Sequence, residues 1–194
     1  MTTRNWRPFL ALAALALSLV ASISTALAAP GSTDPAVARQ LAAVRQATAK
    51  YHDPAVALAD GYLPTEHCVA LPGGGGMGMH YINPGRLGQL DPLRPALLLY
   101  APTAAGPRLV AVEYFQPALL RLPDGTQTLW FDPAPPPAGA TFLPGPTLFG
   151  QPFDGPMPGH EPGMPWHYDL HVWLWQANPA GVFAQWNPNV RCES

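Results

Sequence analysis

The sequence is poor in basic residues. Lysine occurs once, at Lys50, and lysine and arginine together number 10 against 12 acidic residues, which gives a net charge of −2. A chain without a basic surface lacks the electrostatic footprint of a partner for nucleic acid or anionic lipid. Because the only lysine lies in a segment that reads as a scaffold helix, Schiff-base chemistry is not expected either.

Serine and cysteine are also scarce. Beyond residue 28, serine occurs only at Ser32 and Ser194, near the ends of the chain, which argues against a Ser-His-Asp hydrolase. The only cysteines are Cys68 and Cys192. We expect a disulfide between them, as is usual after export, and this bond would leave no thiol nucleophile. A metal site that combines cysteine with histidine is the alternative.

Long hydrophobic runs are absent except at the N-terminus. There, two arginines precede the apolar run Phe9–Ala21, and Ala26–Ala28 has the small residues of a cleavage site. This pattern is typical of a signal peptide, so we assign residues 1–28 to one and residues 29–194 to a single exported domain, periplasmic or secreted. A retained membrane anchor is the alternative, but the run is short for a span. No membrane contact is expected after cleavage.

The remaining sequence predicts an α+β fold. Asp34-Pro35 and Asp53-Pro54 are helix starts, which indicates an N-terminal helical hairpin within residues 29–61. Residues 62–132 and 166–192 are expected to form a mostly antiparallel curved sheet or partial barrel. Its candidate strands include Ala96–Ala101, Arg108–Phe115 and Thr126–Phe131, and Val182–Trp186 is expected to pair back onto the sheet.

Two segments are rich in glycine or proline. Leu71–Tyr81 reads as a flexible glycine run that ends on His80, where glycines let the backbone pass close to another part of the chain. It lacks the Gly-Lys-Ser/Thr of a phosphate loop. Residues 133–165 carry too many prolines and glycines for regular elements but also several large apolar residues. We expect a long ordered loop that covers a site.

The most informative stretch is Trp166–Trp175. Read with a period of two, one face is apolar, and the other carries His167, Asp169 and His171, followed by tryptophans. A half-buried strand explains this alternation. On a helix His167 and His171 would share a face, but the zinc-protease motif requires a glutamate directly after the first histidine, where Tyr168 stands.

These side chains predict a metal site. Residues two apart on a strand are about 7 Å apart and can share an ion, whereas His167 and His171 are about 13 Å apart. We therefore expect Asp169 and His171 to form the site together with His80 and with Glu113, an isolated acid in an apolar strand. His167 is the less reachable candidate ligand. Such a set suits zinc or iron(II) and can leave a coordination position open. The expected function is a metal-binding protein, with a metal-dependent hydrolase or oxygenase as the candidate activity.

Three other interpretations remain open. Every methionine after Met1 lies within three residues of a histidine, as in a copper-binding protein. Alternatively, Trp173, Trp175 and Trp186 line the groove of a non-catalytic envelope binding module for a small or glycan-like ligand. Finally, the histidines and the aspartate could form a structural hydrogen-bonded network.

Several segments together carry a resemblance. They are Gly76–Tyr81, Val112–Tyr114, Pro165–Trp175 and Asn187–Cys192. In these segments the chain resembles a family of exported bacterial proteins without an established activity. The resemblance implies an exported single domain, and it implies no ligand, cofactor or catalytic residue.

Overall fold

The computed structural model describes Met1 and residues 34–192. The predicted cleavage site after Ala28 and all but the first residue of the predicted signal peptide therefore lie outside the described residues. In the part of the chain that is described, no helix is both long enough and apolar enough to cross a membrane.

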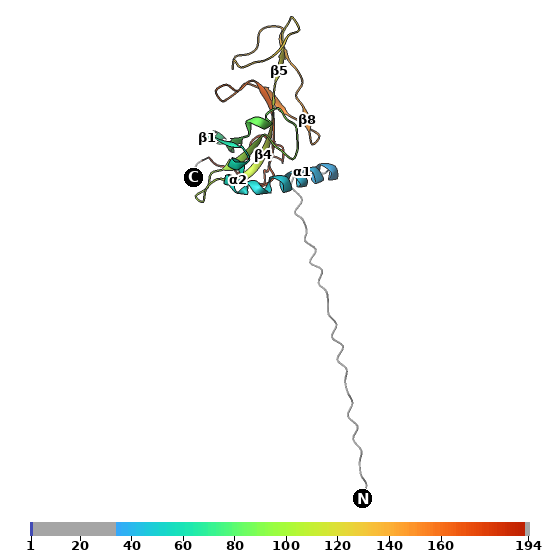
Figure 1. Cartoon of the computed structure of the whole chain (residues 1–194), viewed down its shortest axis with the longest axis vertical. Helices are drawn as coiled ribbons and strands as arrows, with labels where there is room; N and C mark the ends of the chain where they lie inside the picture. Colours follow the sequence, from blue (N-terminus) through green and yellow to red (C-terminus); the bar gives the residue numbers. More distant parts are fainter. Residues whose placement is uncertain (2–33, 193–194) are drawn as a thin grey trace.

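The helices begin where the sequence places them. Helix α1 (Pro35–Thr48) continues into a 3₁₀ turn, η1 (Ala49–His52), and α2 (Pro54–Ala59) follows. The Asp34 side chain accepts a hydrogen bond from the second backbone amide after it, and Asp53 does the same at α2. In both helices a proline at the first position supplies a fixed φ and needs no hydrogen-bond partner for its nitrogen. Figure 1 shows both helices at the lower end of the coloured part of the chain.

A six-stranded sheet forms the centre of the fold, and its strands run in the order β1-β2-β3-β4-β11-β10. Every neighbouring pair is antiparallel. The strands are β1 (Leu63–Leu71), β2 (Gly75–Ile82), β3 (Leu97–Ala101), β4 (Arg108–Pro117), β10 (Asp154–Met157) and β11 (His167–Val172). The α+β fold class is thus confirmed, with an open sheet and no closed barrel.

Smaller elements lie around this sheet. A 3₁₀ turn, η2 (Pro84–Arg86), follows β2. A three-stranded sheet has the order β6-β5-β7, and β8 pairs with β9. Their bounds are β5 (Leu119–Arg121), β6 (Gln127–Leu129), β7 (Thr141–Phe142), β8 (Thr147–Leu148) and β9 (Gln151–Pro152). The expected strand at Thr126–Phe131 corresponds to β6. Val182–Trp186 forms no strand, but the backbone amide of Trp173, just after β11, donates a hydrogen bond to the Val182 carbonyl oxygen.

The two faces of the central sheet differ in what covers them. One face packs against α1 in the main core, where Leu98, Val112 and Leu170 of the sheet meet Leu41 and Val44 of the helix. The opposite face carries smaller apolar clusters around Leu97 and Leu99. Because side chains alternate along a strand, the residues between the core positions of β2, β4 and β11 point to this second face.

The glycine run forms a strand, and the expectation of a flexible segment is wrong for Gly75–Ile82. Glycine is needed there because a Cβ at Gly75 would lie 2.5 Å from the Asn187 carbonyl oxygen, and one at Gly78 would lie 2.6 Å from the Tyr100 carbonyl oxygen. The close backbone approach expected from the sequence is present, and it allows β2 to pair with its neighbours in the sheet.

The proline-rich segment is also more regular than expected. Residues 133–165 contain β7 to β10, and β10 forms the sheet edge beside β11, with Asp154 opposite Asp169. Periodicity could not reveal these strands because each is only two to four residues long.

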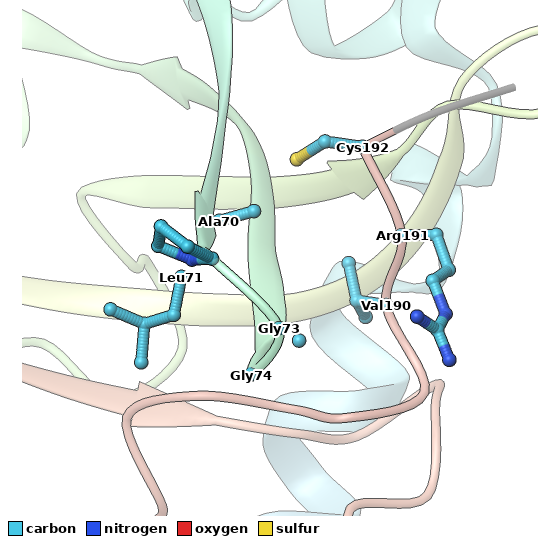
Figure 2. Close-up of a pocket in the computed structure, with 9 residues that line it drawn as sticks. Ala70, Leu71, Gly73, Gly74, Val190, Arg191 and Cys192 are labelled. Carbon is cyan, nitrogen blue, oxygen red and sulfur yellow. The ribbon is translucent and has the colours of Figure 1, made fainter.

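The disulfide between Cys68 and Cys192 is present and joins β1 to the C-terminal segment. Figure 2 shows this region, where the turn at Gly73 and Gly74 lies beside the segment that carries Val190 and Arg191. The surface pocket there has a volume of about 400 Å³ and is lined largely by glycine and apolar residues. It brings no group of titratable side chains together.

Three buried tyrosines connect the sheet to the segments around it. Tyr62, Tyr100 and Tyr114 are fully buried, and each hydroxyl donates a hydrogen bond of 2.6 or 2.7 Å to a backbone carbonyl. Burial raises the pKa of all three phenols well above the ordinary value of 10. The protonated form is therefore the one that the folded state prefers.

We expect the protein to lose stability above pH 10. An acid whose pKa is raised by folding contributes stability fully below its unfolded pKa, and this contribution falls as pH rises above that value. At pH 11 the loss is about 1.4 kcal/mol for each of the three phenols. Urea unfolding between pH 8 and 11 measures it. A Tyr100→Phe variant should show a shallower decline, and an equal decline would contradict the assignment.

Candidate metal centre

Strand β11 carries the predicted row of polar side chains. The segment is extended, as predicted, but its regular part ends at Val172, and all six residues are buried rather than half-buried. His167, Asp169 and His171 are each at most 2 % exposed. Both faces of β11 are covered: Leu170 and Val172 pack in the main core on one face, and on the other His167 stacks on Phe115 and lies beside His160 of the loop.

Three side chains from three strands converge on the second face of the sheet. His171 of β11 lies directly opposite Glu113 of β4, and His80 comes from β2. The Nε2 atom of His80 lies 3.3 Å from Oε2 of Glu113, and Nε2 of His171 lies 3.6 Å from the same oxygen. One ligand atom from each residue lies within 4.8 Å of the others, so this group can hold a metal ion. The expected convergence of these three residues is confirmed.

The atoms at this point have no hydrogen-bond partners among the described residues. Both Oε2 of Glu113 and Nε2 of His171 are buried and unpartnered. A buried polar atom without a partner costs about 1–3 kcal/mol. Two metal–ligand bonds of about 2 Å at a tetrahedral angle place ligand atoms roughly 3.3 Å apart. The two separations from Oε2 of Glu113, 3.3 and 3.6 Å, are close to this spacing.

The charges of this group depend on each other. Burial alone would raise the pKa of the Glu113 carboxyl, but the charges of His171 and His80 lower it to about 2. Burial likewise lowers the pKa of His171, whereas the Glu113 charge raises it to about 9. The metal-free site thus keeps a positive charge on His171 beside the carboxylate. A divalent cation would take over this role and displace the proton.

Asp169 does not join these three ligands, which corrects the set expected from the sequence. Its Oδ1 atom lies 3.6 Å from Nδ1 of His171, the ring nitrogen that points away from Glu113. Its Oδ2 atom lies 3.9 Å from Nε2 of His167. The physical reason is register, because the residue opposite Asp169 on β4 is Phe115 and not an acid. Asp169 therefore stands behind His171, in the place of a group that orients a ligand.

A small cavity lies next to the converging side chains. Its volume is about 10 Å³, which is room for one water-sized group. It is lined by residues from four strands and from the loop before β11, among them His80, Glu113, His160, Glu161 and Met164. The expected covering segment therefore reaches the site through residues 158–165. Sequence patterns did not predict Glu161 at the site. Its position directly after His160, in the loop expected to cover a site, could have indicated it.

The three tryptophans of the alternative ligand groove have different surroundings. Trp173 is 2 % exposed and belongs to the cluster around Leu99 on the second face. Trp175 packs on the main core, where the Arg45 guanidinium lies 4.3 Å from its ring centre. Trp186 is partly buried, and its indole donates to the neighbouring Gln185. The alternation fails here because β11 ends at Val172, before the tryptophans.

The methionines do not gather around the site either. Met79 packs against the main core, on the face opposite His80. Met157 accepts a weak hydrogen bond from Gln185. Among the methionines of the sequence motif, Met164 lines the cavity beside His80 and Glu113. The converging donors are thus two imidazoles and one carboxylate.

The chain matches no protein-family model, no curated protein and no solved structure. The resemblance to exported bacterial proteins accordingly stays a prediction, and the function has to be argued from the site itself.

Proposed function

We propose that this protein is an exported metal-binding protein that holds a divalent ion with His80, Glu113 and His171. The observation that carries the proposal is the convergence of three ligand atoms from three strands, two of them buried without partners. A structural network would direct each donor at an acceptor within about 3 Å. Here the atoms are 3.3–3.9 Å apart, and Oε2 of Glu113 and Nε2 of His171 have no hydrogen-bond partner among the described residues.

The ligand types favour zinc or iron(II) over copper(I). Imidazole and carboxylate donors suit zinc and iron(II), whereas copper(I) prefers thiolate and thioether ligands. Both cysteines are consumed by the disulfide. Oδ1 of Asp169 lies 3.6 Å from Nδ1 of His171, so a small shift on metal binding would form the carboxylate–histidine–metal arrangement that supports many zinc sites.

Three protein ligands leave a coordination position open, which is the arrangement of a catalytic rather than a structural zinc site. The cavity beside the ligands has room for one water-sized group. A metal-dependent hydrolase or oxygenase is consistent with this geometry, provided that the loop over the cavity moves to admit a substrate. The metal would supply Lewis acidity, and Glu161 lies in the cavity wall as a candidate proton acceptor.

Metal content tests the proposal. We expect the metal-depleted protein to take up one tightly held zinc ion per chain on dialysis against limiting zinc, as measured by elemental analysis. The variants His171→Ala and His80→Ala should each lose this ion, because two remaining ligands cannot hold it. The matched control is His67→Ala, an exposed imidazole on β1. Retention of one tightly held zinc ion per chain by His171→Ala, or its loss from His67→Ala, would contradict the proposed site.

A further inference from the structure

His167 has an unusual environment that the first site does not use. Its ring is 1 % exposed and stacks on Phe115 at 4.7 Å. The Nδ1 atom lies 3.2 Å from the Pro165 carbonyl oxygen. A carbonyl only accepts, so Nδ1 carries the hydrogen, and in the neutral ring Nε2 then carries a lone pair. This Nε2 has no hydrogen-bond partner among the described residues.

The lone pair of His167 faces a carboxylate. Oδ2 of Asp169 lies 3.9 Å from Nε2, and Asp169 is 2 % exposed. Two electron-rich atoms at this separation in a buried site repel each other unless a cation lies between them. The separation is shorter than the sum of two metal–ligand bonds, about 4.1 Å, so one ion can contact both atoms.

A third donor is supplied by the covering loop. The His160 ring centre lies 5.3 Å from that of His167, at an angle of 59°. Two imidazoles that share a tetrahedral zinc ion place their ring centres about 5 Å apart. His160 is exposed and belongs to a loop, so it can adjust to an ion that the buried pair holds.

We propose that His167, Asp169 and His160 form a second divalent-metal site beside the first one, with Asp169 between the two. The proposal rests on the proposed function for its first ion. Asp169 directs Oδ1 toward His171 of the first site and Oδ2 toward His167 of the second. Since only the first group has three close ligand atoms among the described residues, the second ion binds more weakly. Its binding also fixes the covering loop against the sheet through His160.

Calorimetric titration of the metal-depleted protein with zinc alone tests this arrangement. We expect two binding events, the second at least about tenfold weaker than the first because its third ligand comes from a loop. The exposed position of His160 makes His160→Ala a variant that folds. The His160→Ala variant should lose the second binding event. Its affinity for the first zinc ion should stay within about threefold of the wild type, because His160 is a ligand of the second ion alone. His171→Ala should lose the first event and keep the second.

The possible outcomes distinguish failure of the second site from failure of the first. A single event in the wild-type protein, or a second event that survives in His160→Ala, overturns the second site and leaves the proposed function intact. Loss of the second event in the control His67→Ala also overturns it, because the weak ion would then be a surface ion. A titration of His171→Ala that equals the wild type contradicts the first site while it leaves the second one standing.

Discussion

Zinc is expected to raise the melting temperature of the metal-depleted protein by about 10 °C. A ligand present at 1,000 times its dissociation constant stabilises the folded state by about 4 kcal/mol. For a chain of this length each kcal/mol corresponds to about 2–4 °C. In Glu113→Gln the part of the zinc effect that the first site supplies should vanish, because the variant removes the negative charge that the two imidazoles share. Thermal unfolding with and without zinc, followed by circular dichroism, measures both effects.

The same experiment separates a metal site from a structural network. Glu113→Gln should lower the stability of the metal-free protein whether or not the site binds an ion, because the Glu113 carboxylate keeps His171 protonated there, so the response to zinc is what distinguishes the two roles. Breaking a buried ion pair that serves the fold would cost about 3–5 kcal/mol. Asp124→Asn, a fully exposed carboxylate in a turn, is the matched control and should retain the zinc effect. A large loss in metal-free Glu113→Gln, combined with no zinc effect in the wild type, would favour the network.

The sequence was sufficient to predict the converging residues because their signals are local. Glu113 is the single acid in an apolar strand, and His171 belongs to an alternating row. In the structure the two residues are direct cross-strand neighbours. Alternation determines the face on which a residue lies, and a buried polar residue on such a face needs a partner. These two rules were enough to bring His80, Glu113 and His171 together.

The role of Asp169 could not be predicted in the same way. The period of two places Asp169 and His171 on the same face of β11, so it predicts the same role for both. Only the register of β11 against β4 distinguishes them. That register places Asp169 opposite Phe115 and His171 opposite Glu113. Register depends on pairing between distant segments, which a single strand's pattern does not encode.

Sequence patterns did not predict the strands β2 and β10, for different reasons. In β2 the glycines have no side chains to show a period of two, yet the backbone pairs with both β1 and β3. In β10 the strand contains Pro156 and lies at the sheet edge, where a missing amide hydrogen is tolerated. Since β10 brings the covering loop back to β11, missing it also concealed how His160 and Glu161 reach the site.

Breaking the disulfide is expected to lower the free energy of unfolding by about 5 kcal/mol. The bond closes a loop with a sequence separation of 124 residues, and the loss of chain entropy in the unfolded state grows with loop length. A typical domain is stable by only 5–15 kcal/mol, so this is a large share of the total. Urea unfolding of the metal-depleted protein, with and without a phosphine reductant, measures the difference. A double variant, Cys68→Ala with Cys192→Ala, should behave like the reduced protein and should not respond to the reductant.

The position of the bond adds a consequence for the metal site. β1 is an edge strand that pairs only with β2, and its register is interrupted between Pro64 and Cys68. The disulfide therefore ties an edge strand of the sheet to the C-terminal segment. Because Thr65 and Val69 of β1 line the cavity beside His80, loosening this strand opens one wall of the site. Reduction should thus accelerate zinc release to a chelator at urea concentrations too low to unfold the sheet. An unchanged release rate would mean that β1 keeps its place through its pairing with β2 alone.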